Sequence, residues 1–338
     1  MIRKLVSLPL CVLALLLLMG ASAAPQQSDA LLAEEESAAL EETALETEAQ
    51  VSLEEEAVTT GADSVSDEEI PWGLRPVEPV EETQPQETQT PAAVDSMILV
   101  DGEAVPASVG RFVENGVTYV ALAPMAQVLD STVTIGWDGV TATVYSDKLN
   151  LTAEVGQLYL VANGRYLYLP EGVRIVNTMV TVPLSAVVEA FGATMAWDSA
   201  SGVIQITRGT GGILHGDDFY NQEDLFWLSR IITAESGNQP LEGQMAVGNV
   251  VMNRVAHPAY PDTVEGVLAQ KNQFSTYRSG ALANRTPTES SIIAAKLVLD
   301  GGEVAETDGA LYFDSTTTSW ASRNRQYAAT LGGHTFYY

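Results

Sequence analysis

The clearest periodic pattern in the chain lies in its last third. Leu225, Leu228 and Ile232 recur at the spacing of one face of a helix. Glu235 continues that face one helical step later, so the sequence predicts that its carboxyl group points inward. The pair Gly237-Asn238 is typical of a helix end, which places Glu235 close to the end of the predicted helix.

A second helix is predicted directly afterwards. Pro240 is typical of a helix start. The inner stripe of this helix consists of three valines, namely Val247, Val251 and Val255.

An internal repeat lies within residues 97–208. Segments 119–146 and 181–207 share a β-type run, a short amphipathic segment, Trp-Asp, a turn and an alternating strand. Each copy is preceded by an Asn-Gly turn, at 115–116 and 163–164, which is typical of a tight β-hairpin. We therefore expect two small strand–helix–strand units that pack together.

Trp137 and Trp197 occupy equivalent positions in the two copies. An aromatic ring there is able to stack on a sugar. A repeated position that ends an amphipathic segment favours packing in the core instead, and we expect both rings to be buried.

The first 96 residues divide into two segments of different composition. Residues 1–24 run from Arg3 and Lys4 through an apolar stretch to small residues, as a secretory signal peptide does. The apolar run of about 15 residues is shorter than the ~20 that a bilayer requires, so we expect cleavage and no stable membrane anchor afterwards. Residues 25–96 hold twenty Asp or Glu against Arg75 alone, which favours a disordered tether over an acidic recognition tail.

The formal net charge of the chain is −28, and most of it belongs to the tether. The remaining chain is mildly acidic, which argues against nucleic acid and anionic membrane surfaces as partners. Cys11, the single cysteine, lies in the predicted signal peptide, so the mature protein has no disulfide and no cysteine nucleophile. The histidines at 215, 257 and 334 show no metal-binding spacing, and we expect neither a zinc amidase nor any cofactor.

The position of Glu235 suits a general acid. Partial burial disfavours the charged carboxylate, and so does the carbonyl end of a helix, so both effects raise the pKa of the carboxyl group. An acid that stays protonated near neutral pH is able to protonate a leaving oxygen. Position alone leaves open an ordinary solvated glutamate at a helix end.

Four sequence motifs that follow one another in a fixed order resemble those of a known family. They are "TAESGNQPLEGQMAVGNVVMNRV", "PDTVEGVLAQKNQFS", "GALYF" and "GGHTFYY". Over about residues 223–338 the chain resembles the SleB/CwlJ-type cell-wall hydrolase family, the spore cortex-lytic enzymes. This resemblance implies a lysozyme-like fold related to lytic transglycosylases, cleavage of peptidoglycan glycan strands, and Glu235 as the catalytic acid. Many members carry Gly-Glu where this chain has Gly237-Asn238, which puts the rate in question but not the assignment of Glu235.

Residues 97–208 resemble a second family, the copper amine oxidase N-terminal-like domain, a small α+β module of secreted proteins. No His or Cys occurs in this segment, so we expect no copper site there.

A lytic transglycosylase needs only one acid, as the family resemblance implies. Glu235 protonates the glycosidic oxygen, and the muramyl 6-hydroxyl then closes a 1,6-anhydro ring, whereas most glycosidases need two carboxylates. Other matched residues are candidates to line the substrate groove, although side chains of these kinds also serve to satisfy backbone groups or fill a core. These candidates are Glu242, Gln244, Asn253, Arg254, Gln273, Phe274, Ser275, Tyr312, Phe313, His334 and Phe336.

The expected protein is a multidomain α+β chain, in which a small repeated β-α-β stalk-type domain precedes a mainly helical lysozyme-like catalytic domain. The expected divisions are a signal peptide at 1–24, an acidic linker at 25–96, a copper amine oxidase N-terminal-like domain at 97–208 and a hydrolase domain at 209–338. The expected function is cleavage of peptidoglycan glycan strands, with secretion and association with the cell wall or spore envelope. The alternative is a non-catalytic peptidoglycan-binding wall protein. Cortex or vegetative wall as substrate, hydrolysis or anhydro-ring formation, and the oligomeric state stay open.

Overall fold

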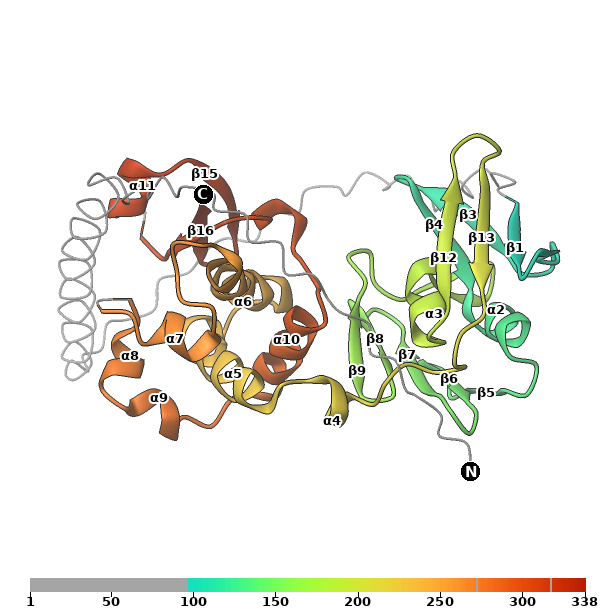
Figure 1. Cartoon of the computed structure of the whole chain (residues 1–338), viewed down its shortest axis with the longest axis horizontal. Helices are drawn as coiled ribbons and strands as arrows, with labels where there is room; N and C mark the ends of the chain where they lie inside the picture. The colour runs from blue at the N-terminus through green and yellow to red at the C-terminus, as the bar shows by residue number, and fades with distance from the viewer. Residues whose placement is uncertain (1–96, 272, 317) are drawn as a thin grey trace, which may run out of the picture.

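The computed structural model describes residues 97–338, apart from 272 and 317 (Figure 1). The predicted signal peptide and acidic linker lie outside these residues. The fold is mixed α+β, with a β-rich N-terminal region (residues 97–208) followed by a mainly helical region (residues 209–338). Within the described residues, no helix combines the length and the apolar character needed to cross a membrane.

The N-terminal region consists mainly of short strands. In chain order its elements are β1 (Ile98–Val100), β2 (Glu103–Ala104), β3 (Arg111–Glu114), β4 (Val117–Ala121), α2 (Leu122–Leu129), β5 (Thr134–Trp137), β6 (Thr141–Tyr145), β7 (Asn150–Glu154), β8 (Tyr159–Ala162), β9 (Arg165–Tyr168), β10 (Arg174–Val176), β11 (Met179–Pro183), α3 (Leu184–Ala190), β12 (Thr194–Asp198) and β13 (Val203–Thr207). They form sheets of strand order β12-β13-β1-β2, β10-β11-β4-β3 and β5-β6-β7-β8-β9.

The helical region carries one small sheet at its C-terminal end. Its elements are α4 (Gly216–Phe219), α5 (Gln222–Ser236), α6 (Leu241–Ala256), α7 (Val264–Leu268), α8 (Ser275–Arg278), α9 (Ala281–Asn284), α10 (Glu289–Leu299), the 3-10 helix η1 (Ala305–Thr307), β14 (Tyr312–Asp314), α11 (Trp320–Asn324), β15 (Tyr327–Leu331) and β16 (His334–Tyr337). The sheet has the order β14-β16-β15.

The two segments compared in the sequence share an element order. Strand, helix, strand, strand occurs as β4-α2-β5-β6 and again as β11-α3-β12-β13. The first strands, β4 and β11, pair with each other, but the hairpins that follow belong to different sheets. The repeat therefore stays a prediction, although each copy supplies one central strand of the sheet β10-β11-β4-β3 and one separate hairpin.

The predicted Asn-Gly turns are confirmed. Asn115 and Gly116 have φ values of 49° and 80° between β3 and β4, and Asn163 and Gly164 have 51° and 79° between β8 and β9. Asn and Gly tolerate this left-handed conformation, which matches the twist of the flanking strands.

The prediction that Trp137 and Trp197 are core residues is wrong. Their exposed fractions are 50% and 60%. Each faces the same side of its sheet as a buried partner, Ala142 for Trp137 and Ile204 for Trp197. Both tryptophans lie on edge strands, β5 and β12, where the side chain extends beyond the packed interior.

The helical region has its own core, and the predicted helix faces are confirmed there. Leu228 and Ile232 of α5 pack with Val247 and Val251 of α6, all with no exposed surface. Gly248 permits this packing, because a Cβ at that position would lie 3.0 Å from Ile232 Cδ1 and 3.1 Å from Val298 Cγ2. Helix α6 therefore runs close to both α5 and α10.

Asn163 links the β8–β9 turn to two other segments. Its Nδ2 donates to the carbonyl oxygens of Lys148 and Ile213, each at 2.8 Å, and its Oδ1 accepts from the amide of Asn150 at 2.8 Å. The chain between the two regions is thus tied to the N-terminal region.

We expect Asn163→Ala to lower the free energy of unfolding by about 2 kcal/mol, because it removes these bonds and a residue suited to positive φ. Urea unfolding of the full chain measures this. Asn115→Ala is the matched control, since Asn115 has nearly the same φ but no side-chain hydrogen bond within the described residues. Equal losses in the two variants would contradict the importance of the side-chain bonds.

Candidate active site

Glu235 lies in the last turn of α5. The helix begins at Asn221, whose side chain accepts hydrogen bonds from the amides of Glu223 and Asp224 and so satisfies two free donors. Burial of Leu228 and Ile232 fixes the rotation of the helix, and Glu235 follows on the same side. The side chain is half-buried, so it is shielded from bulk water without being closed off from a ligand.

The surroundings of Glu235 act on its protonation in two directions. Burial raises the pKa of the carboxyl group, and the positive charge of Arg285 lowers it to a smaller extent. Within the described residues, the carboxyl group has no hydrogen-bond partner. A partly desolvated, unpaired carboxyl group favours the protonated form, which is the form that a general acid requires.

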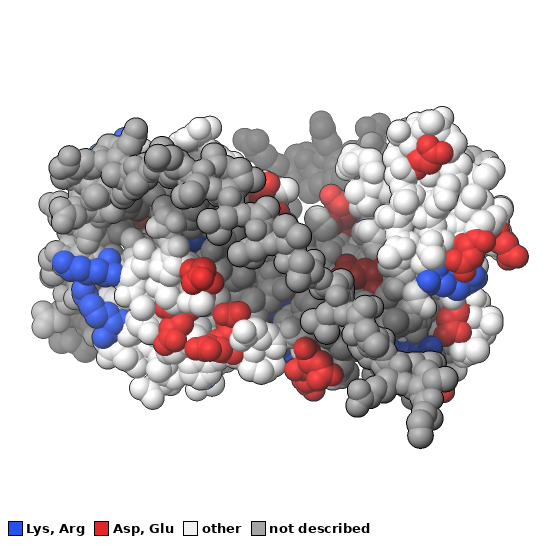
Figure 2. Space-filling model, in the orientation of Figure 1, with Lys and Arg blue, Asp and Glu red and all other residues white. Residues whose placement is uncertain are grey.

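Arg285 is a candidate site residue that the sequence analysis missed, because its positive charge acts on the Glu235 carboxyl group. It caps the C-terminal end of α9 and is exposed. The amide of Thr288 donates to Thr233 Oγ1 at 3.2 Å, which holds the segment after Arg285 against the last turn of α5. Arg285 belongs to none of the recognised sequence motifs, and the chain fold alone brings it to Glu235. Figure 2 shows a group of Lys and Arg side chains at the outer end of the helical region, near the place of α8 in Figure 1.

The connection after Glu235 contacts the C-terminal hairpin. Gln239 Oε1 accepts a hydrogen bond of 2.6 Å from the amide of Gly333, in the turn between β15 and β16. Gly332 in the same turn has a φ of +58°, and a Cβ there would lie 2.3 Å from Gln239 Oε1. The fold thus brings two of the recognised motifs, the one that contains Glu235 and the terminal "GGHTFYY", into contact.

Several predicted groove residues are buried and hydrogen-bonded within the protein, and their contact with substrate stays a prediction. Gln244 is 2% exposed; its amide donates to Gln239 O and Ser290 Oγ and accepts from Ser291 Oγ. Arg254 donates to Leu311 O at 2.8 Å and to Gln273 Oε1 at 2.7 Å. The buried members of the predicted set are Gln244, Arg254, Phe274, Tyr312, His334 and Phe336.

Aromatic packing accounts for most of these buried side chains. The hydroxyl group of Tyr260 donates a hydrogen bond of 3.1 Å to the hydroxyl group of Tyr312. The ring of His334 packs edge-on against Phe313 at 5.5 Å, and burial lowers the pKa of its imidazole. A neutral, enclosed histidine is consistent with a core role.

The other predicted groove residues keep some accessible surface. Ser275 is exposed, and Glu242, Asn253, Gln273 and Phe313 are half-buried. Asn253 Nδ2 donates to Ala310 O at 3.0 Å, and Glu242 accepts from the hydroxyl of Tyr168 at 2.9 Å. Contact of these residues with substrate stays a prediction.

A cavity of about 350 Å³ lies elsewhere, in the N-terminal region, where Lys148, Arg208 and Asp130 contribute to its walls. Residues 97–338, with the two gaps noted above, contain no cluster of three or more His, Asp or Glu suited to a metal ion.

Comparison with known families matches two segments of the chain. Residues 238–337 match the family described as Cell Wall Hydrolase, and residues 99–206 match the Copper amine oxidase N-terminal domain. The hydrolase match begins three residues after Glu235, so it does not itself include the proposed acid.

Several curated proteins are similar to this chain. A spore cortex-lytic enzyme of Bacillus cereus is 31% identical over 120 residues, which are 35% of this chain and 45% of that protein. The spore cortex-lytic enzyme of Bacillus subtilis is 28% identical over 120 residues, 35% of this chain and 38% of that protein. The chain therefore spans less than half the length of these relatives.

Among solved structures, the catalytic domain of the germination-specific lytic transglycosylase SleB from Bacillus anthracis is 30% identical, with 37% of this chain and 100% of that chain covered at a TM-score of 0.32. The catalytic domain of Bacillus cereus SleB is also 30% identical, with 35% and 92% covered and the same TM-score. Residues 238–337 are thus similar to the cell wall hydrolase family, and residues 99–206 are similar to the copper amine oxidase N-terminal domain.

Proposed function

We propose that this protein cleaves the glycan strands of peptidoglycan and that Glu235 is its general acid. The observation that carries the proposal is the half-buried Glu235 carboxyl group, whose pKa is raised by burial, at the end of a helix next to the matched hydrolase segment. The names of the relatives, spore cortex-lytic enzyme and lytic transglycosylase, support the same substrate class.

The proposed reaction uses Glu235 twice. Its proton passes to the glycosidic oxygen as the bond from that oxygen to the muramyl C1 breaks. The muramyl 6-hydroxyl then forms a bond to C1, and its proton returns to the Glu235 carboxylate, which regenerates the acid. Substrate-assisted ring closure of this kind takes the place of the second carboxylate that ordinary glycosidases require.

The rest of the chain receives roles that follow from this activity. We assign catalysis to residues 209–338 and the role of a stalk-type or wall-docking domain to residues 97–208. Secretion through the segment at 1–24 and the acidic linker at 25–96 would bring the enzyme to the cell wall or spore envelope. The names of the relatives favour spore cortex as the substrate.

Glu235→Gln tests the general acid. We expect it to lower the rate at which purified peptidoglycan is cleared by at least about 100-fold, because the amide has no proton to donate. Sedimentation with peptidoglycan should be unchanged. Glu223→Gln is the control, an exposed acid in the first turn of the same helix. Equal clearing by Glu235→Gln and wild type would show that Glu235 is not the catalytic acid. If the wild-type protein cleared no peptidoglycan but sedimented with it, the protein would be a peptidoglycan-binding protein without this activity.

Mass spectrometry of released muropeptides separates the two reaction outcomes. We expect products lighter by one water than hydrolysis products, because the 6-hydroxyl attacks in place of water. Reducing muramic ends would instead indicate lysozyme-type hydrolysis, with Glu235 still the acid.

Arg285→Gln tests the charge beside Glu235. Arg285 lowers the pKa of the Glu235 carboxyl group, so its removal should raise that pKa. Activity needs the protonated acid, and its decline at alkaline pH should therefore move to higher pH in Arg285→Gln. Arg285→Lys should keep the wild-type profile. If all three proteins showed the same pH profile of clearing, the charge of Arg285 would not act on Glu235.

A further inference from the structure

The β8–β9 hairpin belongs to the N-terminal region but packs on the helical region. The rings of Tyr159, Tyr166 and Tyr168 lie against the hydrophobic core of the helical region, whereas neighbouring Leu160 and Leu167 are buried in the core of the N-terminal region. Strand β9 contacts α10. Alternate residues of one hairpin therefore contribute to two cores.

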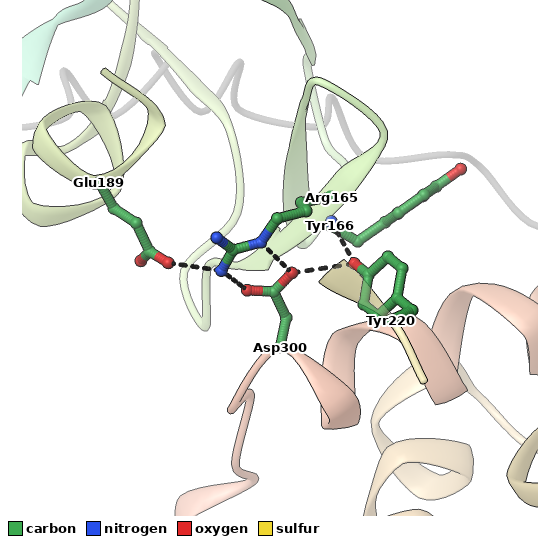
Figure 3. Close-up of polar contacts among 5 residues, drawn as sticks. All are labelled: Arg165, Tyr166, Glu189, Tyr220 and Asp300. Carbon is green, nitrogen blue, oxygen red and sulfur yellow. Dashed lines mark hydrogen bonds and ion pairs between the residues drawn. The ribbon is translucent and has the colours of Figure 1, made fainter. Parts of the chain in front are cut away.

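A buried ion pair lies at the centre of this contact (Figure 3). Arg165 of β9 donates from Nε to Asp300 Oδ2 at 3.0 Å and from its Nη2 to Asp300 Oδ1, and Nη2 also bonds Glu189 Oε1 at 3.0 Å. Asp300 caps the C-terminal end of α10, and its side chain is 1% exposed, against 11% for Arg165. Removal of either partner would leave the other charge buried and uncompensated, which is strongly unfavourable.

The hydroxyl group of Tyr220 completes the network. It donates to Asp300 Oδ2 at 2.9 Å and accepts a hydrogen bond of 2.9 Å from the amide of Tyr166 (Figure 3). The Asp300 carboxylate thus receives three hydrogen bonds from two side chains, one on each side of the contact. Such a fully satisfied buried network fixes geometry.

The chain that joins the two regions is also held in place. The amides of Gly211 and Ile213 donate to the carbonyl oxygens of Phe191 and Ala190 at 3.0 and 3.1 Å, and Gly216 N donates to Asn163 O at 2.8 Å. These bonds leave the joining segment little freedom. Together with the docked hairpin, they set the orientation of the two regions.

Tyr168 extends the contact to the connection that follows Glu235. Its hydroxyl donates to Glu242 Oε1 at 2.9 Å, in the first turn of α6. Burial and the neighbouring Glu242 raise the pKa of Tyr168, so the hydroxyl remains a donor. A Cβ at Gly302 would lie 2.9 Å from Tyr168 Cβ, so the backbone of the helical region packs closely on this side chain. Residues 237–240 separate this turn from α5.

We propose that the N-terminal region is a fixed structural part of the hydrolase, and that Tyr168 is a positioning residue that holds the start of α6, and through it residues 237–240 and Glu235, in the working arrangement. This inference rests on the proposed function for its effect on catalysis. Docking itself does not depend on that function.

Tyr168→Phe in the full chain tests the positioning role. We expect the rate of clearing at saturating peptidoglycan to fall about tenfold, because the variant loses one charge-assisted hydrogen bond to Glu242. The half-saturating concentration of peptidoglycan should be unchanged, because a positioning role does not require Tyr168 to touch substrate. Tyr159→Phe is the control, since the Tyr159 hydroxyl has no hydrogen bond within the described residues. Glu242→Leu should reduce the rate by a similar factor, and the double variant should be no slower than either single one. Additive losses, or a Tyr168→Phe variant as fast as Tyr159→Phe, would overturn the positioning role.

Arg165→Met tests docking without reference to activity. We expect the wild-type chain to unfold in one transition. In Arg165→Met we expect the melting temperature to fall by roughly 10 °C and the unfolding to divide into two transitions, because Asp300 loses its buried partner. Arg174→Met is the control: Arg174 pairs with Glu114 at 2.7 Å inside the N-terminal region, and its removal should leave one transition. One unchanged transition in Arg165→Met would overturn docking. If wild type cleared no peptidoglycan, the proposed function would fail while this measurement still decided whether the regions are docked.

Discussion

The site depends on keeping one carboxyl group partly away from water. Packing of α5 against α6 and α10 removes solvent from one side of Glu235, and burial raises the pKa of the acid. The close approach at Gly248 is part of the same arrangement, since a larger residue there would push α6 away from α5 and α10. An unpaired, desolvated acid lowers the stability of the folded protein, as is common for catalytic groups.

The sequence predicts those features of the structure that depend on regular spacing or on local backbone preference. The face of α5 follows from Leu228 and Ile232 at helical spacing, and the tight hairpin turns follow from Asn-Gly pairs whose backbone preference is local. Both kinds of signal lie within one element. Each therefore remains valid whatever the rest of the chain does.

The errors concern burial, which depends on distant neighbours. Trp137 and Trp197 lie on edge strands, and nothing in their own segments indicates that no further strand covers them. The burial of Gln244 is likewise not visible in its own segment, because its partners Ser290 and Ser291 lie more than forty residues away in the sequence. Arg285 was missed for the same reason, because its relation to Glu235 exists only after α9 and α10 have folded onto α5.

The contact between the two regions bears on how many acids the reaction uses. Glu242 is the nearest carboxylate to Glu235 in the sequence of the second helix, and it is the natural candidate for a second catalytic group. Its carboxylate instead bonds Tyr168 of the N-terminal region, and the charge that acts on Glu235 is that of Arg285. The hydrogen bond from Tyr168 engages one oxygen of the Glu242 carboxylate, Oε1, in the contact between the two regions. The proposed substrate-assisted ring closure does not call on Glu242 as a second acid, because in that reaction the muramyl 6-hydroxyl is the nucleophile.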